Sequence, residues 1–152
     1  MSKTLLLSIL LIDDKSSHEY FCHKYNVSNN IKEKLKLFDK NLKLIKENKE
    51  FFNKDLEKNI YLYDKNHLIN LNILNFVISS KLKLNNFSET LKRIIRSKTY
   101  KFEIDGKYLM KYGMQEGSLM GKALKEIERE WMTNNFKISK ERIKEIIRLH
   151  SN

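Results

Sequence analysis

The sequence predicts an all-α fold, a compact array of about seven helices with no significant sheet. First, none of the 152 residues is proline, and the only four glycines fall between 106 and 121, so helix breakers are scarce. Second, apolar residues recur at intervals of three and four, without the alternation or hairpin turns of strands. Third, a composition of 41% hydrophobic and 32% charged residues is that of a globular chain long enough to bury a core.

The first helices are predicted within residues 5–25. The run LLLSILLI at 5–12 is too short to span a bilayer, and Asp13-Asp14 follow it where a signal peptide would have small residues. We therefore expect a buried first helix, with a cleaved signal as the alternative. Ser16 or Ser17 is a candidate cap for a second, short helix.

The middle of the chain predicts a long amphipathic helix and then a buried one. Ser28 can cap the first of these, whose narrow apolar seam is Ile31, Leu35, Phe38, Leu42 and Ile45. Residues 60–78 are apolar almost all round, which predicts a central buried helix or two short ones broken near 64–66.

Three further amphipathic segments follow. Ser88 is predicted to open a helix that packs through Phe87, Leu91, Ile94 and Ile95 and projects Lys92, Arg93 and Arg96 outward. Apolar stripes at 120–131 and 143–147 predict two closing helices, the last one capped by Ser139. We expect one helical domain, 1–152, which can be subdivided into a body-like part, 1–97, and a tail-like part, 98–152.

The charge distribution indicates a polyanionic partner. The formal net charge is +11, and residues 81–101 alone hold seven Lys/Arg against one acid, Glu89, for a local net of +6. Such clustering favours nucleic acid over a membrane surface, with a merely soluble basic protein as the alternative. Cys22 is the only cysteine, which excludes an intrachain disulfide and fits a reducing, cytoplasmic setting.

The glycines mark the most informative segment, 102–136. We expect Gly113 to end a short helix, 106–112, in a left-handed cap, and Gly117-Ser118 to begin the next helix. Gly121 then falls in the first turn, where tight helix packing or the close approach of a ligand would justify it. The unpaired N–H groups of that helix start could receive a phosphate beside its flanking lysines: Lys107, Lys111, Lys122 and Lys125.

The same segment resembles the C-terminal signature of class II CCA-adding tRNA nucleotidyltransferases and bacterial poly(A) polymerases. That signature reads roughly G-x-D-L, a glycine, then P-G-P-x-I/V-G-x-x-L. This chain has GKYL at 106–109, Gly113, and EGSLMGKAL at 116–124. The order and spacing of the glycines match, whereas Tyr108 stands for the usual Asp, and Glu116 and Ser118 stand for the two prolines.

The resemblance implies a function in tRNA binding without chemistry. The family's catalytic head carries an Asp-x-Asp pair for two metals, and no such pair occurs among the aspartates of this chain. We therefore expect no catalysis by the chain alone, no cofactor and no metal. The candidate RNA-binding residues are Lys92, Arg93, Arg96, Lys98, Lys101, Lys107, Lys111, Gly117, Ser118, Gly121, Lys122 and Lys125. The alternatives are a split enzyme completed by a separate catalytic head chain, and a gene remnant without function.

Three weaker signals complete the prediction. A zinc site usually needs four ligands, and only three potential ligands lie close together in this part of the sequence: His18, Cys22 and His23. Acids at 126, 128 and 130 are expected to pair with Lys122, Lys125 and Arg129 on an exposed helix face. Base stacking is most plausible for three tyrosines that adjoin the cations: Tyr100, Tyr108 and Tyr112.

Overall fold

The computed structural model describes residues 3–13, 15–79 and 82–151, and every regular element among them is a helix. This confirms the all-α class, with nine helices in the described residues instead of about seven. The chain divides into two compact units, Met1–Thr99 and Tyr100–Asn152. Asp14 and Lys81, named in the sequence analysis, lie outside the described residues.

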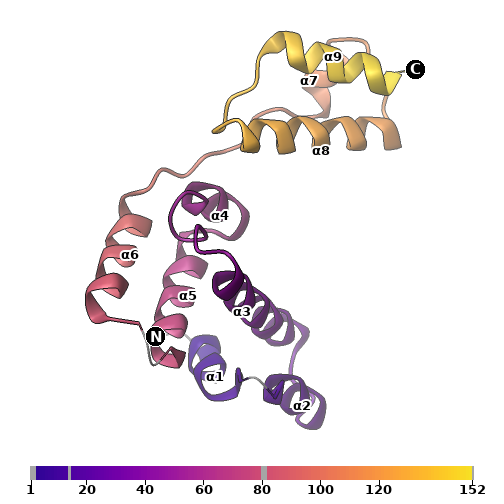
Figure 1. Cartoon of the computed structure of the whole chain (residues 1–152). Coiled ribbons are helices and arrows are strands. Elements are labelled where there is room, and N and C mark those ends of the chain that lie inside the picture. The colour runs from indigo at the N-terminus through magenta and orange to yellow at the C-terminus, as the bar shows by residue number, and fades with distance from the viewer. Residues whose placement is uncertain (1–2, 14, 80–81, 152) are drawn as a thin grey trace. The chain divides into compact units, whose positions relative to one another are not determined.

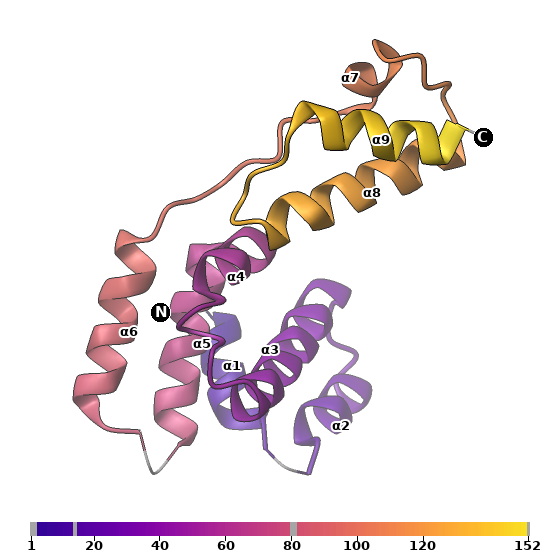
Figure 2. The same ribbon diagram turned by 45° about the horizontal axis from the view of Figure 1, so that its top comes forward.

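Six helices build the first unit (Figure 1). They are α1 (Lys3–Leu11), α2 (Ser17–Lys24), α3 (Asn29–Glu47), α4 (Leu56–Tyr63), α5 (Lys65–Ile78) and α6 (Leu84–Arg96). α5 is central: it packs against α1, α3, α4 and α6. Figure 2 shows α6 lying along α5 at the edge of the unit.

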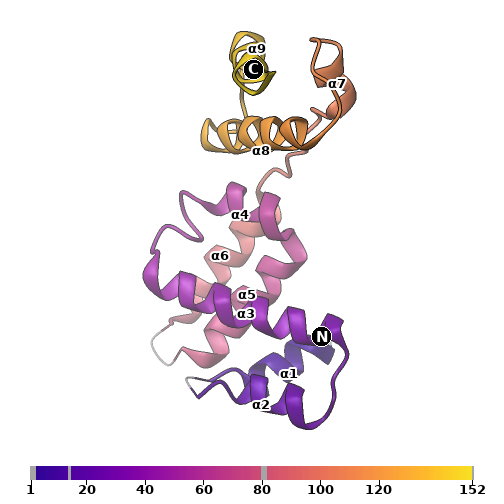
Figure 3. The same ribbon diagram turned by 90° about the vertical axis from the view of Figure 1, so that its right-hand side faces the viewer.

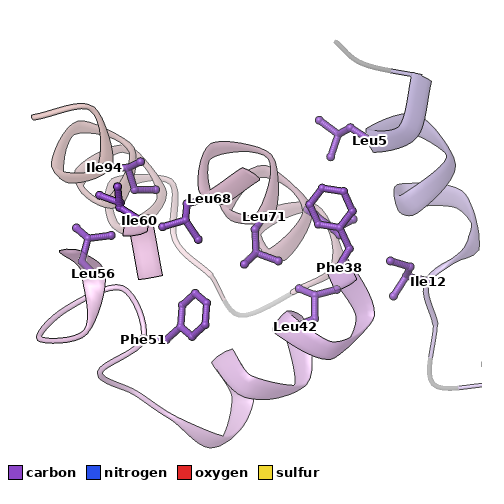
Figure 4. Packing of buried hydrophobic residues seen from close by; sticks show 11 residues of the cluster. Leu5, Ile12, Phe38, Leu42, Phe51, Leu56, Ile60, Leu68, Leu71 and Ile94 are labelled. Atoms are coloured by element: carbon purple, nitrogen blue, oxygen red, sulfur yellow. The ribbon is translucent and has the colours of Figure 1, made fainter. Parts of the chain in front are cut away.

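The core of the first unit gathers around α5 (Figure 4). Leu68, Leu71 and Leu74 are fully buried, and side chains from α1, α3, α4 and α6 surround them. The apolar run at 5–12 does form the expected helix, but only one side of it is buried. Leu5 is 1% exposed, whereas Leu10 is 77% exposed, so α1 covers α3 and α5 and presents leucines to solvent.

Several predicted helix ends are wrong. Asp13, and not Ser16, caps α2: its carboxylate accepts bonds from the backbone N–H and the hydroxyl of Ser17, at 3.0 and 2.6 Å. These bonds lower the pKa of Asp13. Ser28 does precede α3, although its side chain makes no capping bond. α6 begins at Leu84 and not at Ser88, because the Lys83 carbonyl already accepts the N–H of Phe87.

Residues 60–78 break into two helices at Asp64, the second of the two predicted arrangements. Asp64 has φ 66°, and its carboxylate accepts the backbone N–H of His67 at 2.8 Å, which caps α5. A positive φ is unfavourable for a residue that has a side chain. The bond from the His67 N–H to the Asp64 carboxylate offsets that cost, because aspartate can pair with the backbone of its own turn.

Buried asparagines join elements of the first unit. Asn59 donates to the Phe51 carbonyl at 2.8 Å, and Asn72, on α5, donates to the Phe87 carbonyl of α6 at 3.1 Å. Asn41 Nδ2 lies 3.0 Å from His67 Nε2, while its Oδ1 has no partner among the described residues. Asn59 and Asn72 thus pair their buried amide groups with backbone carbonyls, as buried polar groups generally do.

The second unit contains α7 (Gly106–Met110), α8 (Ser118–Thr133) and α9 (Lys140–Ser151). Figure 3 shows α7 and α9 on the same side of α8, and both pack on it. Its core includes Leu109 of α7, Ala123 and Ile127 of α8, and Ile146 of α9, all fully buried. None of the described helices in either unit has the length and apolar character needed to cross a membrane.

Candidate nucleic-acid interface

The first set of candidate RNA-binding cations, which precedes Thr99, lies at the end of α6. Ile94 is fully buried against α5, while Lys92, Arg93 and Arg96, which lie off that buried face, are exposed. Lys98, just after the helix, is exposed as well. The expectation for Ile95 is wrong: it is 56% exposed and adds apolar surface among the cations.

Most of these cations are not neutralised. Among the described residues, no carboxylate forms an ion pair with Lys92, Arg96 or Lys98, and Arg93 donates to the neutral Asn53 side chain. Arg93 and Arg96 also lie in the last turn of α6, where a cation complements the helix dipole by a few tenths of a kcal/mol up to about 1 kcal/mol. That modest gain does not account for Lys92 or Lys98.

The second set lies in the second unit. Lys101, Lys107, Lys111, Lys122 and Lys125 are all exposed, and none forms an ion pair within the described residues. Since the first set lies before Thr99 and this set follows Tyr100, the two sets belong to different units. Each set is therefore described as a separate surface.

Two acidic residues of α8 pair with side chains of α9 instead of with these lysines. Glu130 accepts two bonds from Arg142 of α9, at 2.6 and 2.8 Å, and Arg142 holds the pKa of Glu130 below its usual value. Glu126 lies 2.7 Å from His150, also on α9. The expected pairing of these two acids with Lys122, Lys125 and Arg129 is thus wrong, because side chains of α9 bind both acids.

The glycine segment forms a hollow at the start of α8. Its volume is about 410 Å³, and it is lined by residues 113–119 together with His150. Gly113 and Gly117 adopt φ of 87° and 151°, so both positions disfavour a side chain, and the left-handed turn predicted at Gly113 is confirmed. Gly117 and Ser118, two of the candidate RNA-binding residues, line the hollow, whereas none of the four flanking lysines does.

Gly121 is not explained by packing. A Cβ at this position would meet nothing within 4 Å, so helix packing does not require glycine here. The close contact occurs at Gly106 instead, where a Cβ would lie 2.9 Å from Met120 Sδ. This contact depends on how α7 meets α8, which the local sequence does not reveal.

The three tyrosines that were predicted to stack on bases differ in how accessible their rings are. Tyr100 already stacks on Phe136, with ring centroids 3.9 Å apart and planes within 7°. The hydroxyls of Tyr108 and Tyr112 lie 3.5 Å apart, and Tyr112 is 38% exposed. The Tyr112 ring is therefore the more accessible platform.

His18 and Cys22 are buried, at 2% and 8% exposure, on the helix α2 that packs against α3. No group of three or more potential metal ligands occurs in the part of the chain that the structure describes. The burial of His18 and Cys22 favours a structural role for these two side chains.

A scan against protein-family models and searches of curated proteins and of solved structures find no match for this chain. The likeness to CCA-adding enzymes and poly(A) polymerases therefore depends on sequence patterns alone, chiefly those of segment 102–136.

Proposed function

We propose that the chain is a non-catalytic RNA-binding module that holds tRNA-like RNA through its phosphates. The observation that carries the proposal is the exposure of cations that have no carboxylate partner in the described part of the chain, on the end of α6 and on α7, α8 and their flanks. Acids of the same chain lie close by in sequence, yet Glu126 and Glu130 are bound by α9. The charge that remains is available to a polyanion.

Electrostatics favours a phosphate backbone as that polyanion. Like charges gathered on one helix end repel one another, and at physiological salt this repulsion extends over about 8 Å. A nucleic acid that neutralises them releases its condensed counterions, which supplies affinity without any reading of sequence. Recognition would then follow the shape of a structured RNA. The resemblance of segment 102–136 favours tRNA among such RNAs.

The salt dependence of tRNA binding tests the proposal. If about five phosphates are neutralised, log K should fall with log salt at a slope of about −3.5 to −4.5. Fluorescence anisotropy of labelled tRNA over a series of salt concentrations measures this slope. A nearly flat response would eliminate the proposal.

A pair of matched variants localises the contact. Lys92 and Arg96 lie one turn apart and exposed on α6, and Lys36 and Lys40 lie one turn apart and exposed on α3. We expect K92E/R96E to weaken tRNA binding and to flatten the salt slope by about 2. The control K36E/K40E changes the net charge equally and should have a clearly smaller effect. Equal losses in both variants would show that net charge alone governs binding.

A second candidate function is suggested by α1. Leu6 and Leu10, one turn apart, are 45% and 77% exposed on this first helix, which gives a separate catalytic head chain an apolar surface to contact. In that case the chain would complete a split CCA-adding enzyme. Mixing it with a candidate head and assaying CMP and AMP incorporation into tRNA lacking CCA decides the matter, because an absence of stimulation would exclude it.

A further inference from the structure

A second hollow of the second unit combines an aromatic ring with two cations. Its volume is about 270 Å³, and it is lined by Tyr112, Lys144, Ile147 and Arg148. Tyr112 follows α7, while the other three residues come from α9, so the hollow forms where these two helices lie on the same side of α8 (Figure 3). Ile147 is 3% exposed and forms an apolar floor, and both cations are exposed.

The Tyr112 ring is held in place and already attracts a cation. Its hydroxyl lies 3.5 Å from that of Tyr108, and the two ring centroids are 5.3 Å apart, which restricts the orientation of the ring. Lys144 Nζ lies 5.6 Å from the centroid of the Tyr112 ring. Arg148, one turn further along α9, has no ion pair within the described residues. Neither Lys144 nor Arg148 forms an ion pair with a carboxylate of the described residues.

We propose that Tyr112, Lys144 and Arg148 form a subsite for one unpaired nucleotide of a bound RNA. The ring stacks on the base, and the two cations contact the adjoining phosphates, the combination by which single strands are held without sequence preference. A phosphate alone would make no use of the exposed ring. The hollow is smaller than the pockets of about 300–1,000 Å³ that enclose larger ligands, which suits a single base. This inference rests on the proposed RNA-binding function and adds a preference for an unpaired segment.

The test compares two RNAs and separates the ring from the charges. Anisotropy is measured with labelled hexauridylate and with a labelled blunt RNA duplex. We expect Y112A to weaken binding of hexauridylate about fivefold or more and to leave duplex binding unchanged, while Y112F, which keeps the ring, binds like the wild type. Thermal melts monitored by circular dichroism establish that each variant folds.

The charges have a test of their own, which stands even if Y112A fails to fold. K144A/R148A should flatten the salt slope for hexauridylate by about 1.4, since each phosphate contact on a single strand contributes about 0.7. The control K137A/K140A removes two exposed cations, one at the first residue of the same helix and one three residues before it, and should leave the slope unchanged.

The outcomes distinguish this inference from the proposed function. Unchanged hexauridylate binding by both Y112A and K144A/R148A would refute the subsite, while duplex or tRNA binding by the wild type would keep the proposed function standing. A wild-type chain that binds none of these RNAs would refute both.

Discussion

Replacing Leu71 with alanine tests whether α5 is the centre of the first unit. Leu71 is fully buried, and the core cluster that contains it draws side chains from α1, α3, α4 and α6. Removing its terminal carbons forfeits about 1.5–3 kcal/mol of burial, and the cavity that remains raises the total to about 2–5 kcal/mol. For a unit of this size, each kcal/mol corresponds to about 4–8 °C in Tm.

The matched control is Leu10→Ala on α1. The chemical change is the same, but Leu10 is 77% exposed, so its loss should cost within about 0.5 kcal/mol. Urea unfolding followed by circular dichroism measures both variants, and an unchanged m-value shows that the comparison concerns stability alone. Equal losses for L71A and L10A would refute the described core.

Two further predictions concern polar groups of the same unit. Asn72→Ala removes the donor to the Phe87 carbonyl and should cost about 0.5–1.5 kcal/mol, with faster hydrogen exchange at α6 amides; unchanged exchange would contradict the role given to this bond. His67 has a pKa lowered by burial, an effect that Asp64 partly opposes. On acidification the unfolded state therefore binds a proton on His67 before the folded state does. The free energy of unfolding keeps its full value above about pH 6.5 and decreases as the pH falls below that value. It becomes constant again below the pKa of His67 in the folded protein. Urea unfolding at pH 7.5 and 5.5 should show this loss in the wild type and a smaller one in H67Q.

Periodicity predicted the parts of the fold that depend on local patterns. Leu35, Phe38 and Leu42 are buried on one face of α3 because a regular apolar spacing puts them on one side of any helix. Gly113 was predictable for a similar reason, since a left-handed φ after a short helix is a local property.

Features that depend on distant contacts were not predictable. The acids of α8 were assigned to neighbouring lysines, but Arg142 and His150 reach them from α9. The close contact at Gly106 comes from Met120 of another helix. The hollow beside Tyr112 was missed because Lys144 and Arg148 lie more than thirty residues further along the chain. Two cations one turn apart on the last predicted helix, Lys144 and Arg148, were the sequence signal that could have suggested the hollow.

The buried asparagines have a consequence for the uniqueness of the first unit. Leucine and isoleucine surfaces are interchangeable, so α6 could slide along α5 by one turn, about 5.4 Å, and still exclude water. The bond from Asn72 to the Phe87 carbonyl forms at the observed position, and a buried amide that loses its partner carries a cost in free energy. A polar side chain thus adds a directional bond to a contact that is otherwise apolar, and it favours the position from which the cations of α6 emerge.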